Sequence, residues 1–164
     1  MLNSVKIIPN PKVFKLIDGY FYLPKKPTVS FRNCCKDQNV LRLLKQIIPS
    51  FEVVNESSII TFNKSDLKEE AYEINVNHNM IDIYASSPKG WFYALQSLRQ
   101  ITKDERIPCC YIMDYPDLSV RGVMLDISRS KVPKVDTLKK VFDLLAFLKY
   151  NHVELYVEGF SFEY

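Results

Sequence analysis

The chain has 164 residues, of which 47% are hydrophobic and 25% charged, a globular composition that argues against a disordered protein. Its 22 Lys and Arg barely outnumber its 19 Asp and Glu, and these charges are scattered, so nucleic-acid binding is disfavoured. No apolar run reaches the roughly 18–20 residues that would span a membrane. Residues 1–6 lack the apolar core of a signal peptide, so we expect a cytoplasmic protein unless a leader was trimmed.

The four cysteines form two adjacent pairs, Cys34-Cys35 and Cys109-Cys110. Neighbouring residues on a strand point to opposite faces, so such a pair does not easily supply two ligands to one metal. We therefore expect reduced thiols that pack as small hydrophobes, and neither a metal site nor a cofactor.

The first fifty residues predict two strands and a helix. Segments 5–8 and 20–23 are short and apolar and lie on either side of a predicted turn at Asp18-Gly19. Apolar residues then recur at helical spacing from Val40 to Ile48, with Asp37 as a suitable N-cap and Pro49 ending the helix.

The next block is rich in strands. Segments 58–62, 71–76 and 80–85 are β-branched or alternate apolar with polar residues, and residues 77–79 predict a hairpin turn. Ser87 and Pro88 open a helix with Trp91 on its apolar side, and residues 109–113 predict another strand. The predicted fold class is α+β, with an antiparallel sheet covered by two helices.

The pattern changes after residues 114–117, which look like a boundary. Residues 120–127 form a nearly continuous apolar run, which is typical of a strand buried on both faces. Asp136 is the expected cap of a helix, and residues 153–157 predict a second apolar strand. Strand, helix and strand imply a parallel pair with a right-handed crossover. Because such a unit needs further strands and helices beside it, we expect the sequence to end partway into a larger α/β domain.

Four sequence segments stand out by their residues and by their order along the chain: 70–74 with 81–83, 90–98, 112–116 and 121–129. The most specific is Arg121-Gly122-Val123-Met124-Leu125-Asp126-Ile127-Ser128-Arg129, just after Asp114-Tyr115-Pro116. In this order the segments resemble the family-20 glycoside hydrolases, the β-N-acetylhexosaminidases. The resemblance is loose over nearly the whole chain and strong from about residue 71 to residue 129.

The resemblance implies a division of the chain into two parts. Residues 1–115 would be the family's non-catalytic N-terminal α+β domain, and residues 116–164 the start of a truncated (β/α)₈ barrel. Active sites of such barrels lie at the carboxyl ends of the strands.

The resemblance also implies a substrate-assisted retaining mechanism. The 2-acetamido oxygen of the substrate attacks the anomeric carbon, a Glu protonates the leaving oxygen, and an adjacent Asp orients the acetamido group. This Asp-Glu pair is expected beyond residue 164, so no catalytic residue is assigned here. Asp104-Glu105 lies ahead of the barrel and is expected to be a solvated turn.

By resemblance, Arg121 reaches the hydroxyl groups of the sugar, because a guanidinium holds two oxygens at once. The alternative for Arg121 is an ion pair with Asp126 or another carboxylate. Asp126 and Arg129 are expected to support the strand end. Glu158 either reaches the sugar from the end of the second strand or lies in water at the rim. Residues 151–160 depart from the Asn-x-x-His-x-His pattern of many members, which leaves the sugar preference open.

Two aromatic residues also need an assignment. Trp91 is expected to be a core residue rather than a platform for a sugar, and Tyr156 is the better candidate for a binding pocket.

The sequence thus predicts the N-terminal portion of a β-N-acetylhexosaminidase that acts on glycans containing N-acetylhexosamine. Binding to nucleic acid or membrane is not expected. The alternatives are a stand-alone scaffold or binding module, and a related glycosidase such as an O-linked N-acetylglucosaminidase or an α-glucuronidase. Residues 1–164 alone are expected to be inactive. Residues 118–164 are expected to fold back on the first part or to self-associate through exposed strands.

Overall fold

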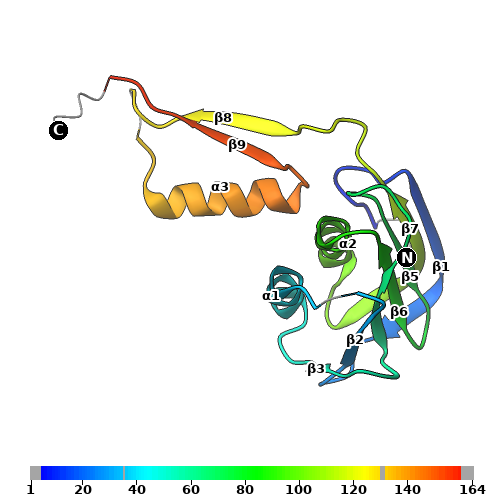
Figure 1. Cartoon of the computed structure of the whole chain (residues 1–164). Coiled ribbons are helices and arrows are strands. Elements are labelled where there is room, and N and C mark those ends of the chain that lie inside the picture. Colours follow the sequence, from blue (N-terminus) through cyan, green and yellow to red (C-terminus); the bar gives the residue numbers. More distant parts are fainter. Residues whose placement is uncertain (1–4, 35, 130–131, 160–164) are drawn as a thin grey trace. The chain divides into compact units, whose positions relative to one another are not determined.

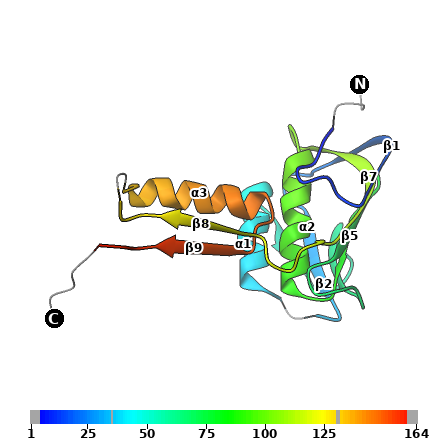
Figure 2. The ribbon, with the colours of Figure 1, turned by 90° about the horizontal axis from the view of Figure 1, so that it is seen from above.

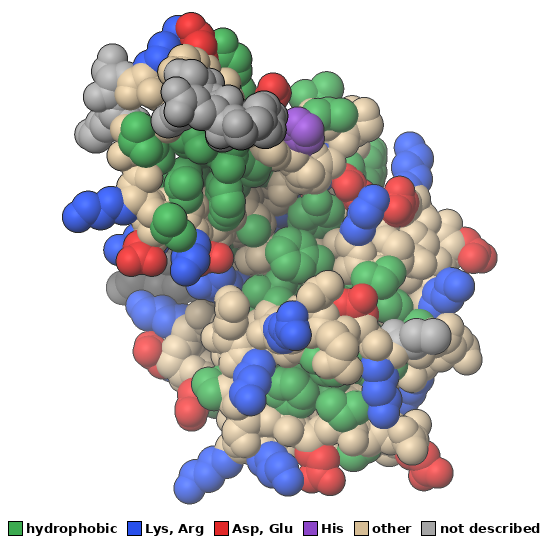
Figure 3. Space-filling view, turned by 60° about the vertical axis from the view of Figure 1, so that its left-hand side comes forward, with side chains coloured by type: hydrophobic (Ala, Val, Ile, Leu, Met, Phe, Trp, Pro, Cys, Tyr) green, Lys and Arg blue, Asp and Glu red, His purple; other side chains and the backbone are tan. Residues whose placement is uncertain are grey.

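The computed structural model describes residues 5–34, 36–129 and 132–159. The chain divides into two compact units, the first extending to Pro116 and the second beginning at Asp117. No helix in these ranges is both long and apolar enough to cross a membrane. On the face drawn in Figure 3, basic and acidic side chains are interspersed rather than gathered in one patch.

The first unit combines two helices with a sheet that has seven strands among the described residues (Figure 1). The sheet order is β1-β7-β5-β6-β4-β2-β3. The elements are β1 (Val13–Tyr22), β2 (Thr28–Arg32), α1 (Gln38–Ile47), β3 (Glu52–Val53), β4 (Ile60–Lys64), β5 (Tyr72–Val76), β6 (Ile81–Ala85), α2 (Pro88–Ile101) and β7 (Arg106–Asp114).

The sheet is mixed, so the predicted antiparallel sheet is correct for only one half of it. β1, β7, β5 and β6 pair antiparallel in that order, whereas β6, β4, β2 and β3 pair parallel. Alternation of apolar and polar residues identifies a strand and its buried face but carries no information on the direction of its neighbour. The parallel half arises because α1 connects β2 to β3, and because β6 enters the sheet between β5 and β4.

Both helices lie on one face of the sheet, as the two views of Figures 1 and 2 agree. The alternation predicted for β5 and β6 is confirmed, since Tyr72, Ile74 and Val76 are buried while Glu73 and Asn75 are more exposed. Trp91 of α2 is 2% exposed. Its ring meets those of Phe31 and Phe62 edge-on at centroid distances of 6.3 and 6.1 Å. Trp91 is therefore the core residue that its helical spacing indicates.

The N-termini of both helices have their predicted caps. The carboxylate of Asp37 accepts hydrogen bonds from the backbone N–H groups of Asn39 and Val40, at 2.9 and 3.0 Å. The hydroxyl oxygen of Ser87 accepts from the N–H of Gly90 at 3.4 Å, with Pro88 in the first turn. Each cap supplies acceptors to N–H groups that have no partner within the helix.

The start of the chain differs from prediction. Residues 5–8 are not a strand, although Ile7 is 1% exposed and belongs to the core. β1 instead runs through Asp18-Gly19, where its pairing with β7 shifts register between Leu16 and Tyr20. Gly19 has a φ of +95°, and a Cβ there would lie 2.1 Å from Cε1 of His78. The glycine therefore marks a bulge within one strand rather than the predicted turn between two.

The second unit contains β8 (Gly122–Asp126), α3 (Val135–Phe147) and β9 (His152–Tyr156). β8 and β9 pair parallel, with Gly122 opposite His152 and Asp126 opposite Tyr156, which confirms the predicted strand-helix-strand unit. The prediction that the first strand is buried on both faces is wrong for the described chain. No residue of β8, α3 or β9 is buried, because the described part of the second unit has only two strands to pack against one helix.

The start of α3 also corrects the sequence analysis. Its N-cap is Lys134, without a side-chain hydrogen bond, and Asp136 lies within the first turn. An acidic residue in the first turn still interacts favourably with the positive end of the helix dipole. The sequence therefore predicted a helix here correctly, but it placed the N-cap at Asp136, two residues after the actual N-cap Lys134.

Candidate functional site

Polar side chains gather where β8 and β9 end. Because the two strands run parallel and Asp126 lies opposite Tyr156, the residues that come after them emerge at the same edge. Ser128 and Arg129 come after β8, and Glu158 comes after β9. These five residues form a group that we call the carboxyl-edge cluster.

Arg129 lies at the centre of this cluster. Its Nε donates to Oδ2 of Asp126, and its Nη1 lies 3.8 Å from Oε2 of Glu158. The guanidinium carbon is 5.5 Å from the ring centroid of Tyr156, within the range of a cation–π contact. One guanidinium therefore contacts both carboxylates and the phenol ring of the cluster.

Ser128 joins the two strand ends. Its N–H and its hydroxyl both donate to Oδ1 of Asp126 at 2.9 Å, and its hydroxyl oxygen accepts from the N–H of Glu158 at 2.8 Å. The hydroxyl of Tyr156 in turn donates to Oε2 of Glu158. The sequence pattern did not lead us to assign Ser128 a role, although a Ser two residues after an Asp is a common local hydrogen-bonding signal.

The hydrogen bonds fix the charge states in the cluster. The N–H of Ser128 and then the guanidinium of Arg129 hold the pKa of Asp126 well below its usual range, so Asp126 is an ionised acceptor and a poor proton donor. The hydrogen bond to Glu158 raises the pKa of Tyr156, which keeps its phenol neutral. The cluster therefore offers charged donors and acceptors suited to binding hydroxyl groups, and Asp126 is not suited to general-acid catalysis.

Arg121 lies at the other edge of the strand pair. Its Nε donates to the carbonyl oxygen of Lys149 at 2.9 Å, and its Nη1 to that of Leu118 at 2.7 Å. Its backbone N–H donates to Oδ1 of Asn151 at 2.8 Å. The structure thus brings Glu158, Asp126 and Arg129 together but places Arg121 apart from them. Asp126 forms its ion pair with Arg129.

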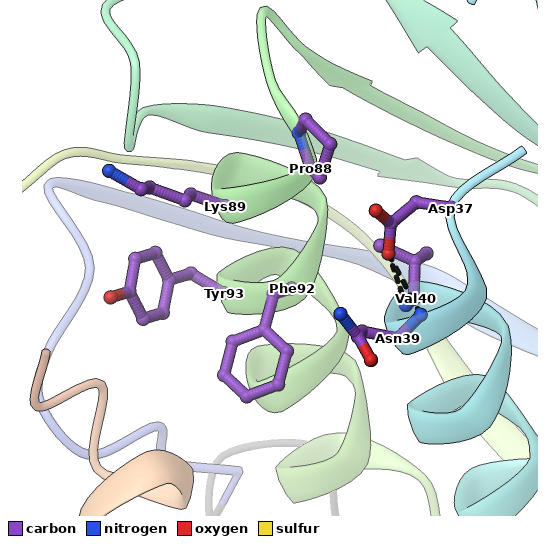
Figure 4. A pocket seen from close by; sticks show the side chains of 7 residues that line it. All are labelled: Asp37, Asn39, Val40, Pro88, Lys89, Phe92 and Tyr93. Carbon is purple, nitrogen blue, oxygen red and sulfur yellow. Dashed lines mark hydrogen bonds between the residues drawn. The ribbon is translucent and has the colours of Figure 1, made fainter. Parts of the chain in front are cut away.

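The first unit contains a pocket of about 330 Å³ between the N-terminal turns of α1 and α2 (Figure 4). The pocket is lined on one side by the N-cap Asp37 and by Asn39 and Val40 of α1, and on the other by Pro88, Lys89, Phe92 and Tyr93 of α2. Its one carboxylate, that of Asp37, is engaged in capping α1. The described residues that line the pocket therefore include no pair of carboxylates for glycosidic chemistry.

Two further sequence expectations concern possible sites. Asp104 and Glu105 lie in an exposed turn with φ values of 51° and 58°, and Asp104 is 3.8 Å from Arg106, as expected for a solvated charged turn. Cys34, Cys109 and Cys110 are free thiols, while Cys35 lies outside the described residues. Within the described ranges, no three His, Cys, Asp or Glu side chains converge as metal ligands.

Comparison with known sequences connects this chain to one family. Residues 4–115 match the family described as glycosyl hydrolase family 20, domain 2. A β-hexosaminidase of Vibrio furnissii is 25% identical over 156 residues, which are 90% of this chain and 25% of that protein. A β-hexosaminidase of Akkermansia muciniphila is 33% identical over 96 residues, which are 56% of this chain and 19% of that protein. The chain thus spans about a quarter or less of these relatives.

Solved structures give the same result. A β-N-acetylhexosaminidase of Bacteroides fragilis superposes with a TM-score of 0.83 at 31% identity, over 91% of this chain and 32% of that one. A family-20 exo-β-N-acetylglucosaminidase of Vibrio harveyi, solved with N-acetylglucosamine, gives a TM-score of 0.81 at 27% identity, over 93% and 25% of the two chains. Through its domain 2, which accounts for most of the first unit, this chain belongs to glycoside hydrolase family 20.

Proposed function

We propose that this chain is the leading part of a β-N-acetylhexosaminidase. In this proposal residues 1–115 are the non-catalytic domain, and residues 116–164 are the first strand, helix and second strand of a catalytic (β/α)₈ barrel. The family-20 match over residues 4–115 supports the first assignment. The parallel β8–β9 pair, joined through α3, supports the second because it is the repeating unit of such a barrel.

The substrate in this proposal is a glycan with a terminal N-acetylhexosamine. The catalytic Asp-Glu pair lies beyond residue 164, and the acetamido group of the substrate acts as the nucleophile. The 164 residues then supply binding groups rather than the proton donor. The low pKa of Asp126 agrees with this division, because an ionised carboxylate accepts hydrogen bonds but gives up no proton at neutral pH.

The carboxyl-edge cluster is the observation that carries the proposal. Barrel enzymes act at the carboxyl ends of their strands, and the cluster is at that edge of β8 and β9. We assign Arg129 and Glu158 to binding sugar hydroxyls, with Asp126 and Ser128 holding them in place. Arg121 keeps its proposed contact with the sugar, which rests on the resemblance alone, and in this structure its guanidinium donates to two backbone carbonyls.

Kinetics of Arg129 variants test this assignment. In the natural gene product, Arg129→Ala should lower kcat/KM for an aryl N-acetyl-β-glucosaminide by at least about tenfold, the cost of a charge-assisted hydrogen bond to substrate. Arg42→Ala is the matched control, because Arg42 is an exposed residue of α1. Equal kinetics for both variants would remove Arg129 from the site.

The competing hypothesis is a stand-alone binding module. It predicts that residues 1–164 retain a glycan in an affinity assay, and that no Asp-Glu pair is encoded after Tyr164. The enzyme proposal predicts that such a pair is encoded in the same reading frame.

A further inference from the structure

Asp114, the last residue of β7, is only 8% exposed although it carries a carboxylate. Its Oδ1 accepts from the backbone N–H of Tyr115 at 3.0 Å and from that of Lys12 at 3.3 Å. Lys12 comes just before β1, which pairs with β7. One carboxylate therefore ties the segment that enters β1 to the segment that leaves β7.

The second oxygen of this carboxylate connects to the core. The hydroxyl of Tyr72 donates to Oδ2 of Asp114 at 3.1 Å and lies 2.6 Å from the hydroxyl of Ser97 on α2. Tyr72 is 1% exposed, and its burial raises its pKa, so the phenol keeps the proton that it donates. Asp114 is thus held directly by Tyr72 of β5, and Ser97 of α2 acts on it only through the hydroxyl of Tyr72.

The next residue is also held. Nζ of Lys12 and Nζ of Lys68 lie 5.2 and 5.6 Å from the ring centroid of Tyr115. Both distances suit cation–π contacts. Pro116 comes next and restricts the backbone of Tyr115 to extended conformations. Residues 114–116 are therefore constrained by the carboxylate, by the flanking cations and by proline.

Stability alone does not explain a buried carboxylate at this point. Replacing a buried polar network by apolar side chains of similar volume is often neutral for stability, whereas the network also restricts the relative positions of the groups that it joins. The geometry specified here is that of the last residues of the first unit, directly before the second unit begins at Asp117.

We propose that Asp114, Tyr72 and Ser97 form an anchor that fixes the direction in which the chain leaves the first unit. Asp114 holds the exit segment, Tyr72 holds Asp114, and Ser97 holds the hydroxyl of Tyr72. The direction of exit is then a property of the first unit itself, independent of the second unit.

Residue-resolved amide hydrogen exchange on the full chain tests the anchor. In Asp114→Ala the N–H groups of Lys12 and Tyr115 lose their acceptor, so we expect their exchange to quicken by about tenfold or more. Tyr72→Phe keeps the carboxylate of Asp114 but removes its hydrogen bond from β5. A smaller increase in the exchange rate should therefore appear at the same two amides. Tyr111→Phe is the matched control, because it removes a strand hydroxyl that bonds to Glu73 instead.

The amides of Ile74 and Ile83, in the middle of the sheet, separate a local effect from a global one. The anchor predicts that hydrogen exchange quickens more at the amides of Lys12 and Tyr115 than at these central amides. Unchanged exchange at Lys12 and Tyr115 in Asp114→Ala would overturn the proposal. Equally fast exchange at the amides of Ile74 and Ile83 would also overturn it, since the network would then stabilise the whole first unit. If Asp114→Ala does not fold, the same comparison of Lys12 and Tyr115 with Ile74 and Ile83 is made in Tyr72→Phe, and its result decides the proposal.

Discussion

Arg121 and Glu158, both expected from the sequence to contact a sugar, lie at opposite edges of the β8–β9 pair. Arg121 precedes β8 and donates to two backbone carbonyls, whereas Glu158 comes after β9 and approaches Arg129. Arg121 and Ile127 are separated by the five residues of β8, so their Cα atoms are roughly 20 Å apart at the usual rise of a strand. The two residues therefore make different contacts within the second unit, and contact of each with a sugar stays a prediction.

This separation predicts different effects on stability. Arg121→Ala leaves the carbonyl groups of Lys149 and Leu118 without this donor and should destabilise the second unit by about 1–3 kcal/mol. Arg129→Ala breaks a largely exposed ion pair and should cost less than about 1 kcal/mol. Urea unfolding, followed through amide signals of β8 and β9, measures both. A larger loss for Arg129→Ala would contradict these roles.

Asp126 should titrate abnormally low. Its pKa is lowered by the N–H of Ser128 and by Arg129 from a reference value of 3.8. Because the folded-state pKa is depressed, the stability that Asp126 contributes is fully present above about pH 4. It declines as the pH falls further and is lost below the folded-state pKa. Carboxyl-carbon NMR should therefore show no Asp126 midpoint between about pH 3 and 5.

Arg129→Gln gives the internal comparison for this titration. This change removes the Arg129 hydrogen bond, one of the two main causes of the low pKa of Asp126, so the titration midpoint of Asp126 should move toward 3.8. The hydrogen bonds of Ser128 should still keep the midpoint below that value. A midpoint near 3.8 in the unaltered chain would mean that the Ser128 and Arg129 contacts do not persist in solution.

Gly90 in α2 should not tolerate a methyl group. A Cβ at this position would lie 2.5 Å from the carbonyl oxygen of Ala71 and 2.7 Å from Cβ of Ala85. Ala is the better helix former by about 1 kcal/mol, but forcing apart packed backbone costs more than that, so Gly90→Ala should be destabilising by about 1–3 kcal/mol. Urea unfolding followed by the fluorescence of Trp91, the single tryptophan, reports the first unit. Lys89→Ala, an exposed change in the same turn, is the control and should be nearly neutral.

The second unit exposes several large apolar side chains. Met124 is 57% exposed, Leu155 41% and Phe142 37%. Residues 1–164 alone are therefore expected to self-associate or to fold the second unit back on the first. Sedimentation velocity over a concentration series distinguishes these outcomes, and Leu155→Lys should weaken self-association. A strictly monomeric chain with freely mobile residues 118–159 would contradict both.

Local chemistry was readable from the sequence, and long-range pairing was not. The caps at Asp37 and Ser87 and the buried face of β5 depend on residues a few positions apart, and all three were predicted correctly. The direction of β4 relative to β6 depends on where a distant strand enters the sheet, and no periodicity records this. Gly19 was misread because a glycine bulge and a turn share the same local signal.

The candidate site shows the same limit. Arg121 and Arg129 frame one motif, and the motif alone does not say which arginine lies at the carboxyl edge. The strand bounds settle this, because β8 begins after Arg121 and ends before Arg129. Which of the two arginines contacts a sugar stays a prediction, because the strand bounds place the residues and do not assign their roles.

The most direct test of the account is hydrolysis of an aryl N-acetyl-β-glucosaminide, measured side by side for the natural gene product and for residues 1–164 alone. The account predicts turnover by the natural product, carried by an Asp-Glu pair encoded after Tyr164, and none by residues 1–164. Turnover by residues 1–164, or an inactive natural product that carries the Asp-Glu pair, would contradict it.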